Sequence, residues 1–188
     1  MPVAAKPRMT ADQFIAWTLQ QPEGERYELA SGEVVAMAPE RAGHSRAKSR
    51  IHRALADTVA AAAGLPCEAF PDGMAVRIGD DTVYEPDALV RCGPPVDDEA
   101  VEIGDPVIVV EVVSPSSRGR DTATKLADYC RLGSLRHYLI FWAARGLLIH
   151  HRRTDDAGIE TAILRAGALR LDLPGLVLDT GRLLDPLS

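Results

Sequence analysis

The feature that most constrains the fold is an apolar run at residues 107–113 that contains a single charged side chain. Six of its seven residues are valine or isoleucine, and only Glu111 interrupts them. A continuous β-branched run predicts a central strand buried on both faces of a sheet. An unpaired carboxylate in such a strand is costly unless its pKa rises until the group is neutral. We therefore expect another group to compensate the charge of Glu111.

Hydrophobic patterning along the rest of the chain predicts an α/β sheet with helices packed on it. Helices are expected over three segments: 9–21 (with Thr10 as N-cap), 44–63 and 121–132. Strands are expected as two short elements within 26–39, one each over 67–78, 82–92 and 107–113, and a pair within 136–153. The chain after residue 158 indicates only one weaker strand and closing loops. The length suits one domain over 9–188, after a flexible tail at 1–8.

Charge and cysteine usage limit the classes of function. The net charge of −6 argues against a protein that coats nucleic acid indiscriminately. A local basic run nevertheless extends over 41–56 without any acid, and either a phosphate-binding surface or a solvated helix face explains it. The three cysteines are odd in number and lack a CxxC pair, which predicts reduced thiols in a cytoplasmic protein. No apolar stretch is long enough for a membrane span.

Asp87 is a second acid inside an apolar segment, "YEPDALV". Pro86 cannot donate a ladder hydrogen bond, so the strand should be bulged or at an edge there, which can re-aim Asp87. If this strand neighbours the one with Glu111, the two carboxylates converge and need a cation between them. Hard oxygen ligands favour Mg²⁺ or Mn²⁺ over zinc. The alternative is that Asp87 caps the proline turn and Glu111 pairs with an arginine.

Lys125 is the third candidate, on the helix expected after the strand. Helical spacing places Asp121 and Lys125 on one face, which favours a surface ion pair between them. The opposite face, expected to be buried, carries Ala123, Leu126, Ala127 and Cys130. The loop at 114–117 returns this helix past the strand end that carries Glu111, so Lys125 could also reach a metal-bound phosphate. His150 and His151 face opposite sides of a strand and are poor joint zinc ligands.

These segments together resemble a known family. Asp87 behind a proline, "VVEVVSPSS", "DTATKLADY" and "RYELASGEVVAMAP" are similar to the putative restriction endonuclease family of the PD-(D/E)XK nuclease superfamily, over residues 9–153. The resemblance implies one nuclease-like domain with a restriction-endonuclease-like mixed central sheet flanked by helices, and an N-terminal helix and β-hairpin extension. It implies Asp87 and Glu111 as metal ligands. The superfamily's usual lysine is Val113 here, and Lys125 matches the lysine that replaces it in this family.

Two further positions, Glu28 and His44, match the family. His44 is a candidate catalytic residue, but it begins the helix face continued by Ala47 and Ile51, which favours a packed or capping histidine. Nucleic-acid contacts are expected from five basic residues near the site: Arg46, Lys48, Arg50, Arg118 and Arg120.

The resemblance implies an endonuclease that hydrolyses nucleic-acid phosphodiester bonds, with DNA as the expected substrate. Mg²⁺ or Mn²⁺ held by Asp87 and Glu111 would lower the pKa of a bound water, and Lys125 would orient that water or stabilise the developing charge. Many nucleases cut two strands as dimers, which suggests a homodimer. The alternative is a nuclease-fold protein that has lost cleavage and binds nucleic acid or a protein partner.

Overall fold

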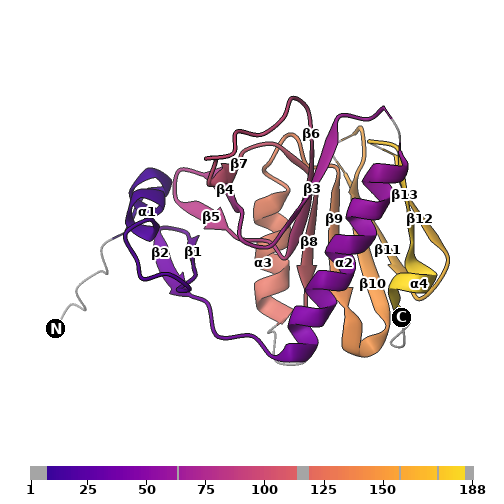
Figure 1. Ribbon diagram of the computed structural model, residues 1–188, viewed down its shortest axis with the longest axis horizontal. Helices are drawn as coiled ribbons and strands as arrows, with labels where there is room; N and C mark the ends of the chain where they lie inside the picture. The colour runs from indigo at the N-terminus through magenta and orange to yellow at the C-terminus, as the bar shows by residue number, and fades with distance from the viewer. Residues whose placement is uncertain (1–7, 63, 114–118, 157, 173, 185–188) are drawn as a thin grey trace.

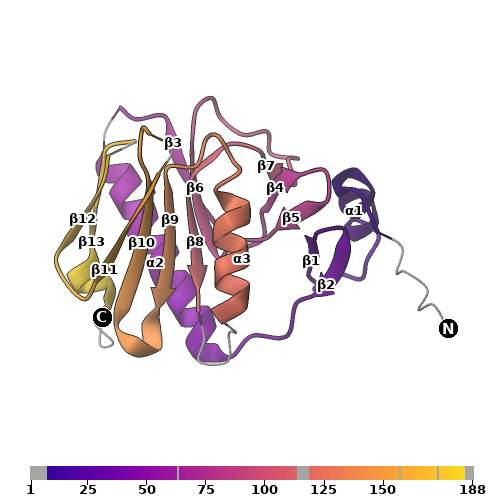
Figure 2. The ribbon, with the colours of Figure 1, turned by 180° about the vertical axis from the view of Figure 1, so that it is seen from behind.

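The computed structural model describes residues 8–62, 64–113, 119–156, 158–172 and 174–184. Within these ranges the strands form a six-stranded sheet, a five-stranded sheet and a two-stranded ribbon. Helices α2 (Ala42–Ala61) and α3 (Gly119–Tyr129) lie on opposite faces of the larger sheet (Figures 1 and 2). The result is a mixed α/β fold flanked by helices, as the sequence predicts. Most of the tail predicted at 1–8 lies outside the described residues.

The larger sheet has the order β11-β10-β9-β8-β6-β3. Strand β8 (Pro106–Val112) is interior, parallel to β9 (His137–Trp142) and antiparallel to β6 (Ala88–Cys92). The other strands are β11 (Ile159–Leu164), β10 (Leu147–Arg153) and β3 (Cys67–Pro71), each antiparallel to its neighbours. The predicted pair within 136–153 is β9 and β10, joined by a short 3-10 turn, Ala143–Arg145. This sheet is mixed and places the glutamate-bearing strand at its centre.

Both faces of β8 are buried, which explains its uninterrupted apolar run. Ile108, Val110 and Val112 pack in the cluster that includes Ile51 and Leu55 of α2. Val109, on the opposite face, packs in a second cluster with Tyr129, at the end of α3, and Tyr138. The side chain of Glu111 shares the Val109 face, because alternate residues of a strand point the same way.

The five-stranded sheet lies beside the larger one, in the order β2-β1-β5-β4-β7. Its strands are β2 (Glu33–Ala36), β1 (Tyr27–Ala30), β5 (Thr82–Tyr84), β4 (Ala75–Gly79) and β7 (Glu102–Ile103). Helix α1 (Ala11–Thr18) packs on it through Phe14 and begins with the predicted cap, since the Thr10 side chain accepts a hydrogen bond from the Gln13 N–H. The predicted N-terminal helix and hairpin are therefore present.

The prediction of one strand each over 67–78 and 82–92 is wrong. Each segment contains two strands, which belong to different sheets. The first break contains Gly73, whose φ of +110° disfavours other residues. The second contains Pro86, which cannot donate a backbone hydrogen bond. Within residues 67–92 the chain therefore crosses twice between the sheets, and the second of these crossings carries Asp87.

The C-terminal region is more structured than its sequence indicates. It forms β11, β12 (Ala168–Leu171), β13 (Leu176–Asp179) and the short helix α4 (Thr180–Leu184). The leucines at alternate positions of β12 and β13 pack into the cluster on the α2 side of the sheet. Short alternating segments of this kind gain their stability from this packing, which a local pattern shows only weakly.

The prediction of three reduced cysteines is also wrong. Cys67 and Cys92 are directly opposed on β3 and β6 and form a disulfide, while Cys130 is free. The two residues are 25 positions apart, so only the pairing of the strands brings them together. Among the described helices, none combines the length and the apolar character that a bilayer crossing requires.

Candidate functional site

Asp87 lies in the link at 85–87 between β5 and β6, where the chain passes from one sheet to the other. Its N–H donates to the Val110 carbonyl at 3.0 Å, and its Oδ2 accepts a hydrogen bond from the Val112 N–H at 2.6 Å. These bonds fix Asp87 against the end of β8 that carries Glu111. The predicted neighbourhood of the two strands is confirmed, but Pro86 precedes β6 instead of creating a bulge or an edge within it.

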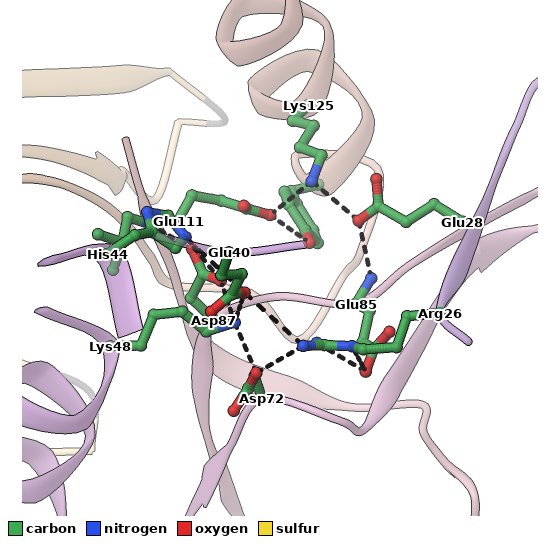
Figure 3. Close-up of polar contacts among 12 residues, drawn as sticks. Arg26, Glu28, Glu40, His44, Lys48, Asp72, Glu85, Asp87, Glu111 and Lys125 are labelled. Carbon is green, nitrogen blue, oxygen red and sulfur yellow. Dashed lines mark hydrogen bonds and ion pairs between the residues drawn. The ribbon is translucent and has the colours of Figure 1, made fainter. Parts of the chain in front are cut away.

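Glu111 is compensated by a buried lysine. Lys125 Nζ donates to Glu111 Oε1 at 3.1 Å and to Glu28 Oε1 at 2.9 Å (Figure 3). Tyr129 donates its hydroxyl hydrogen to the same Glu111 oxygen at 3.0 Å. Glu28 also accepts a hydrogen bond from the Glu85 N–H at 3.0 Å. Among the described residues, the charged partner of Glu111 is thus a lysine and not the arginine of the alternative, and this lysine bridges two carboxylates from different sheets.

Helix α3 is rotated relative to the expectation from its sequence. Lys125 and Tyr129 are buried, whereas Ala123 and Ala127, which were expected to be buried, are exposed. A tyrosine offers far more apolar surface than an alanine, so the face with Tyr129 and the Lys125 stem packs inward. Lys125 is therefore buried between Glu28 and Glu111 and does not lie on the surface as predicted. The side chain of Asp121 lies outside the described residues.

Burial raises the pKa of Glu111 to about 7. The charge of Lys125 opposes this rise, while the nearby carboxylates of Asp87 and Glu28 add to it. For Lys125, burial disfavours the ammonium form, but the charges of Glu111 and Glu28 outweigh burial and raise its pKa. Burial likewise raises the pKa of Tyr129, which keeps its hydroxyl protonated as a donor. The carboxylate of Glu111 therefore titrates near neutral pH beside a lysine that remains charged.

This shift predicts a pH-dependent stability. The pKa of Glu111 is about 7 in the folded protein against 4.5 for an ordinary glutamate, so its contribution is fully present below 4.5 and lost as the pH rises through 7. Glu111→Gln should remove this loss, which is on the order of 3 kcal/mol. In EDTA, the variant should match or exceed the stability of wild type at about pH 8. If Glu111 is a metal ligand, added Mg²⁺ or Mn²⁺ should stabilise wild type and not the variant.

Chemical unfolding at about pH 5 and about pH 8 measures this effect. Glu68→Gln is a suitable control, because Glu68 is exposed on β3 and the change removes the same charge. A variant at position 111 that is much less stable than wild type at the higher pH would show that the Glu111–Lys125 pair is a net stabilising ion pair.

Lys48 lies inside the site and not on a basic surface. Its Nζ contacts Asp87 Oδ1 at 3.1 Å, Asp72 Oδ2 at 2.5 Å and the Glu40 carboxylate, and the residue is only 4% exposed (Figure 3). This burial contradicts the predicted contact between Lys48 and nucleic-acid phosphates. The lysine instead holds three carboxylates together at the start of α2.

His44 also faces Asp87. Its Nε2 lies 3.9 Å from Asp87 Oδ1 and 4.0 Å from Glu40 Oε1. The three side chains each offer one ligand atom, and these atoms lie within 4.8 Å of one another. The histidine is therefore placed beside a carboxylate of the site, not packed in the core as the helix pattern favoured. Sequence analysis missed Glu40, for which the only signal is its spacing of four residues from His44.

Carboxylates outnumber cations in this region. Six acids and three permanently charged bases contact one another there, a formal excess of three negative charges: Glu28, Glu40, Asp72, Glu85, Asp87 and Glu111 with Arg26, Lys48 and Lys125. Uncompensated carboxylates attract a cation, and oxygen ligands favour Mg²⁺ or Mn²⁺. The arrangement can therefore bind a divalent ion at Asp87, with Glu40, His44 or Glu111 as further ligands.

The remaining basic candidates lie elsewhere. Arg46, Arg50 and Arg53 line a groove of about 700 Å³ between α2 and the segments that carry Leu178 and Leu183. Arg46 lies about 200° around the helix from both His44 and Lys48, so the groove opens on the other side of α2. Arg118 lies outside the described residues, as does the side chain of Arg120.

His150 and His151 do not form a common site. His150 Nε2 lies 2.9 Å from His137 Nδ1 in the interior, and His151 Nδ1 lies 2.8 Å from the Thr161 hydroxyl. Burial and the neighbouring His137 lower the pKa of His150 to about 4, so it is neutral at physiological pH. These separate partners agree with the expectation that the two histidines are not joint zinc ligands.

Comparisons with known proteins agree with this fold. A crystal structure of a putative nuclease belonging to DUF820 from Anabaena variabilis superimposes with a TM-score of 0.72 at 16% identity, covering 94% of this chain and 97% of the other. Two uncharacterised Synechocystis proteins are similar in sequence. One, slr1290, is 25% identical over 82% of this chain and 80% of its own length. The other, sll1609, is 24% identical over 83% and 87%, respectively.

The structural similarity confirms the predicted nuclease-like fold. The model of the Uma2 family, described as putative restriction endonuclease, matches residues 11–181, which is nearly the whole described chain. The chain therefore belongs to the Uma2 putative restriction endonuclease family.

Proposed function

We propose that this protein is a divalent-metal-dependent endonuclease that hydrolyses phosphodiester bonds of DNA. The observation that carries the proposal is the convergence of Asp87 from the β5–β6 link, Glu111 from β8 and Lys125 from α3 within a region of excess negative charge. Membership of the Uma2 family and the fold shared with a putative nuclease support hydrolysis of nucleic acid.

The donor set fits a divalent cation. Asp87 Oδ2 is held by a backbone N–H, while Oδ1 faces His44 and Lys48. Among the residues that the structure describes, both hydrogen bonds to the Glu111 carboxylate end on Oε1, which leaves Oε2 for a ligand. We assign Asp87 as the shared ligand, with Glu111 from β8, His44 from the first turn of α2 and Glu40 from the segment before that helix as its partners. When bound, Mg²⁺ or Mn²⁺ supplies a water of lowered pKa and positive charge beside the scissile phosphate.

The protein groups would orient this chemistry. The Val112 N–H fixes the rotation of the Asp87 carboxylate, and Lys125 with Tyr129 fixes that of Glu111. Lys125 thereby adds positive charge at the site, although its contacts make it first a positioning group for Glu111. His44 is within reach of the Asp87 carboxylate and could bind the cation or accept a proton from the attacking water.

A hollow beside the site gives access to it. It has a volume of about 600 Å³ and is lined by residues 24–27 and 36–40, including Arg26 and Glu40. Arg26 also pairs with Asp72 at 2.8 Å, so the hollow borders the same charged network. We infer that the scissile phosphate approaches from this side, where a guanidinium is already present.

The groove along α2 would bind flanking phosphates. Arg46 and Arg53 are exposed along it, and Arg50 lies with its guanidinium carbon 5.4 Å from the centre of the Phe141 ring. The double change Arg46→Gln with Arg53→Gln should weaken DNA binding equally for different sequences. It should also lower the slope of log affinity against log salt by about one for each phosphate that the variant no longer neutralises.

Fluorescence anisotropy over a salt series measures that slope. Arg131→Gln, an exposed arginine after α3, is the single-charge control and should leave it unchanged. An unaltered slope in the double variant would show that the groove does not bind DNA phosphates.

Cleavage assays test the proposed function itself. Purified protein should nick or linearise plasmid DNA with Mg²⁺ or Mn²⁺ and be inactive in EDTA, and an RNA substrate of equal length distinguishes the two nucleic acids. Binding without cleavage in either metal would support the alternative, a nuclease-fold protein that only binds nucleic acid.

A further inference from the structure

We propose that two copies of this chain pair edge to edge through β11 and form a homodimer with a continuous sheet. Among the described strands, β11 is one of the two edge strands of the six-stranded sheet and has only β10 beside it. Residues 159–163 of this strand are all exposed, including Ile159 at 46% and Ile163 at 66%. An exposed edge strand with large apolar side chains is a template for pairing with another strand.

The sequence of β11 is self-complementary in an antiparallel pair. If Thr161 of one copy lies opposite Thr161 of the other, Ile159 lies opposite Ile163 at both ends. Glu160 then lies opposite Ala162, and Leu164 opposite Gly158. Cross-strand pairs of β-branched residues stabilise a sheet, and no charge faces a like charge in this register. A two-fold axis through Thr161 therefore satisfies every side-chain pair.

Neighbouring registers are less favourable. A shift that centres the pair on Glu160 places two carboxylates directly opposite each other, which is destabilising. A shift that centres it on Ala162 places Glu160 opposite Leu164 and separates the isoleucines. Charge and shape thus favour the register centred on Thr161. This match of β11 with itself is the reason to propose a second copy of the chain, and not an unrelated strand, as the partner.

Apolar side chains on the face of the sheet near β11 also favour a second copy of the chain as the partner. Ile163 pairs with the half-buried Ile149 of β10, so both lie on the face that carries α3. Helix α3 covers that face near β8, and β10 and β11 lie farther along the sheet (Figure 2). Pairing two β11 strands would join the apolar patches of both copies. On the other face, Glu160 keeps its own partner, Arg152, at 2.5 Å.

Sedimentation of the full-length protein tests the dimer. Wild type should sediment as a dimer that dissociates on dilution, and Ile163→Lys should be monomeric, because two lysines would face the apolar patch. Val35→Lys is the matched control: Val35 is 47% exposed on β2, which lies at the opposite end of the molecule from β11 (Figure 1), and this variant should remain dimeric. A monomeric wild type at every concentration, or a dimer that Ile163→Lys leaves intact, would overturn the proposal.

Cross-linking tests the register independently of any effect on folding. In a Cys130→Ser background, Thr161→Cys should form an intermolecular disulfide under mild oxidation, because the two positions face each other across the axis. Ala162→Cys is offset from its counterpart and should not cross-link. Equal cross-linking of both variants, or of neither, would reject the register centred on Thr161. Neither experiment depends on metal binding or cleavage.

Discussion

Replacement of Lys125 by methionine should lower the free energy of unfolding by about 3–5 kcal/mol at about pH 8. The change removes the ammonium group that lies between Glu28 and Glu111 and leaves two largely buried carboxylates, each 13% exposed, without it. The sequence alone predicts a loss of only a few tenths of a kcal/mol, because it places Lys125 in an exposed helix pair. Urea unfolding followed by circular dichroism measures the difference between these two values.

The pH and a second substitution provide the controls. The loss should shrink at about pH 5, since the pKa of Glu111 is already about 7 and protonation removes its charge. Adding Glu111→Gln to the lysine variant should recover part of the stability for the same reason. Arg131→Met removes an exposed cation near the end of α3 and should cost far less. A loss of less than about 1 kcal/mol for Lys125→Met would contradict the burial of this lysine, because a loss of that size is typical of an exposed ion pair.

Asp87→Asn should reduce metal-dependent cleavage by about 10²-fold or more. The amide oxygen can still accept the hydrogen bond from the Val112 N–H, so the local fold should persist. The variant loses the negative charge that faces His44 and Lys48, and with it the ligand that we assign to the metal. Single-turnover cleavage rates at saturating Mg²⁺ measure the effect.

Asp105→Asn is the matched control for the aspartate. Asp105 is exposed just before β8, at the opposite end from Glu111, and pairs with Arg91. Its loss should leave cleavage unchanged. Cleavage by Asp87→Asn at the rate of wild type would remove Asp87 from the site.

The central strand and the main helix could be predicted because their signals are local. The continuous valine run of β8 and the helical spacing of Ala47, Ile51 and Leu55 in α2 are each contained within one element. Neither signal depends on a contact with a distant segment. Asp87 and Glu111 could be singled out for the same reason, since a charge inside an apolar strand is unusual. The prediction that the two carboxylates lie close together depended on the assumption that β6 and β8 are neighbouring strands.

The rest depends on contacts between distant segments. Glu28 reaches Lys125 from a strand 97 residues earlier, and no pattern within α3 indicates such a partner. The burial of Lys48 likewise requires Asp72, which lies at the break between β3 and β4 that the sequence analysis missed. Where acidic side chains from separate elements lie close together, a basic residue can be buried among them. The hydrophobic pattern of its helix then no longer predicts on which face the basic residue lies.

Anomalous diffraction from crystals soaked with Mn²⁺ would test the central claim most directly. We expect one strong peak at the Asp87 carboxylate, within ligand distance of Glu111 or of the pair His44 and Glu40. The same soak of Asp87→Asn crystals should lose the peak. A wild-type structure with ordered Mn²⁺ elsewhere and none at Asp87 would contradict the proposed metal centre, and with it the assignment of this site to phosphodiester hydrolysis.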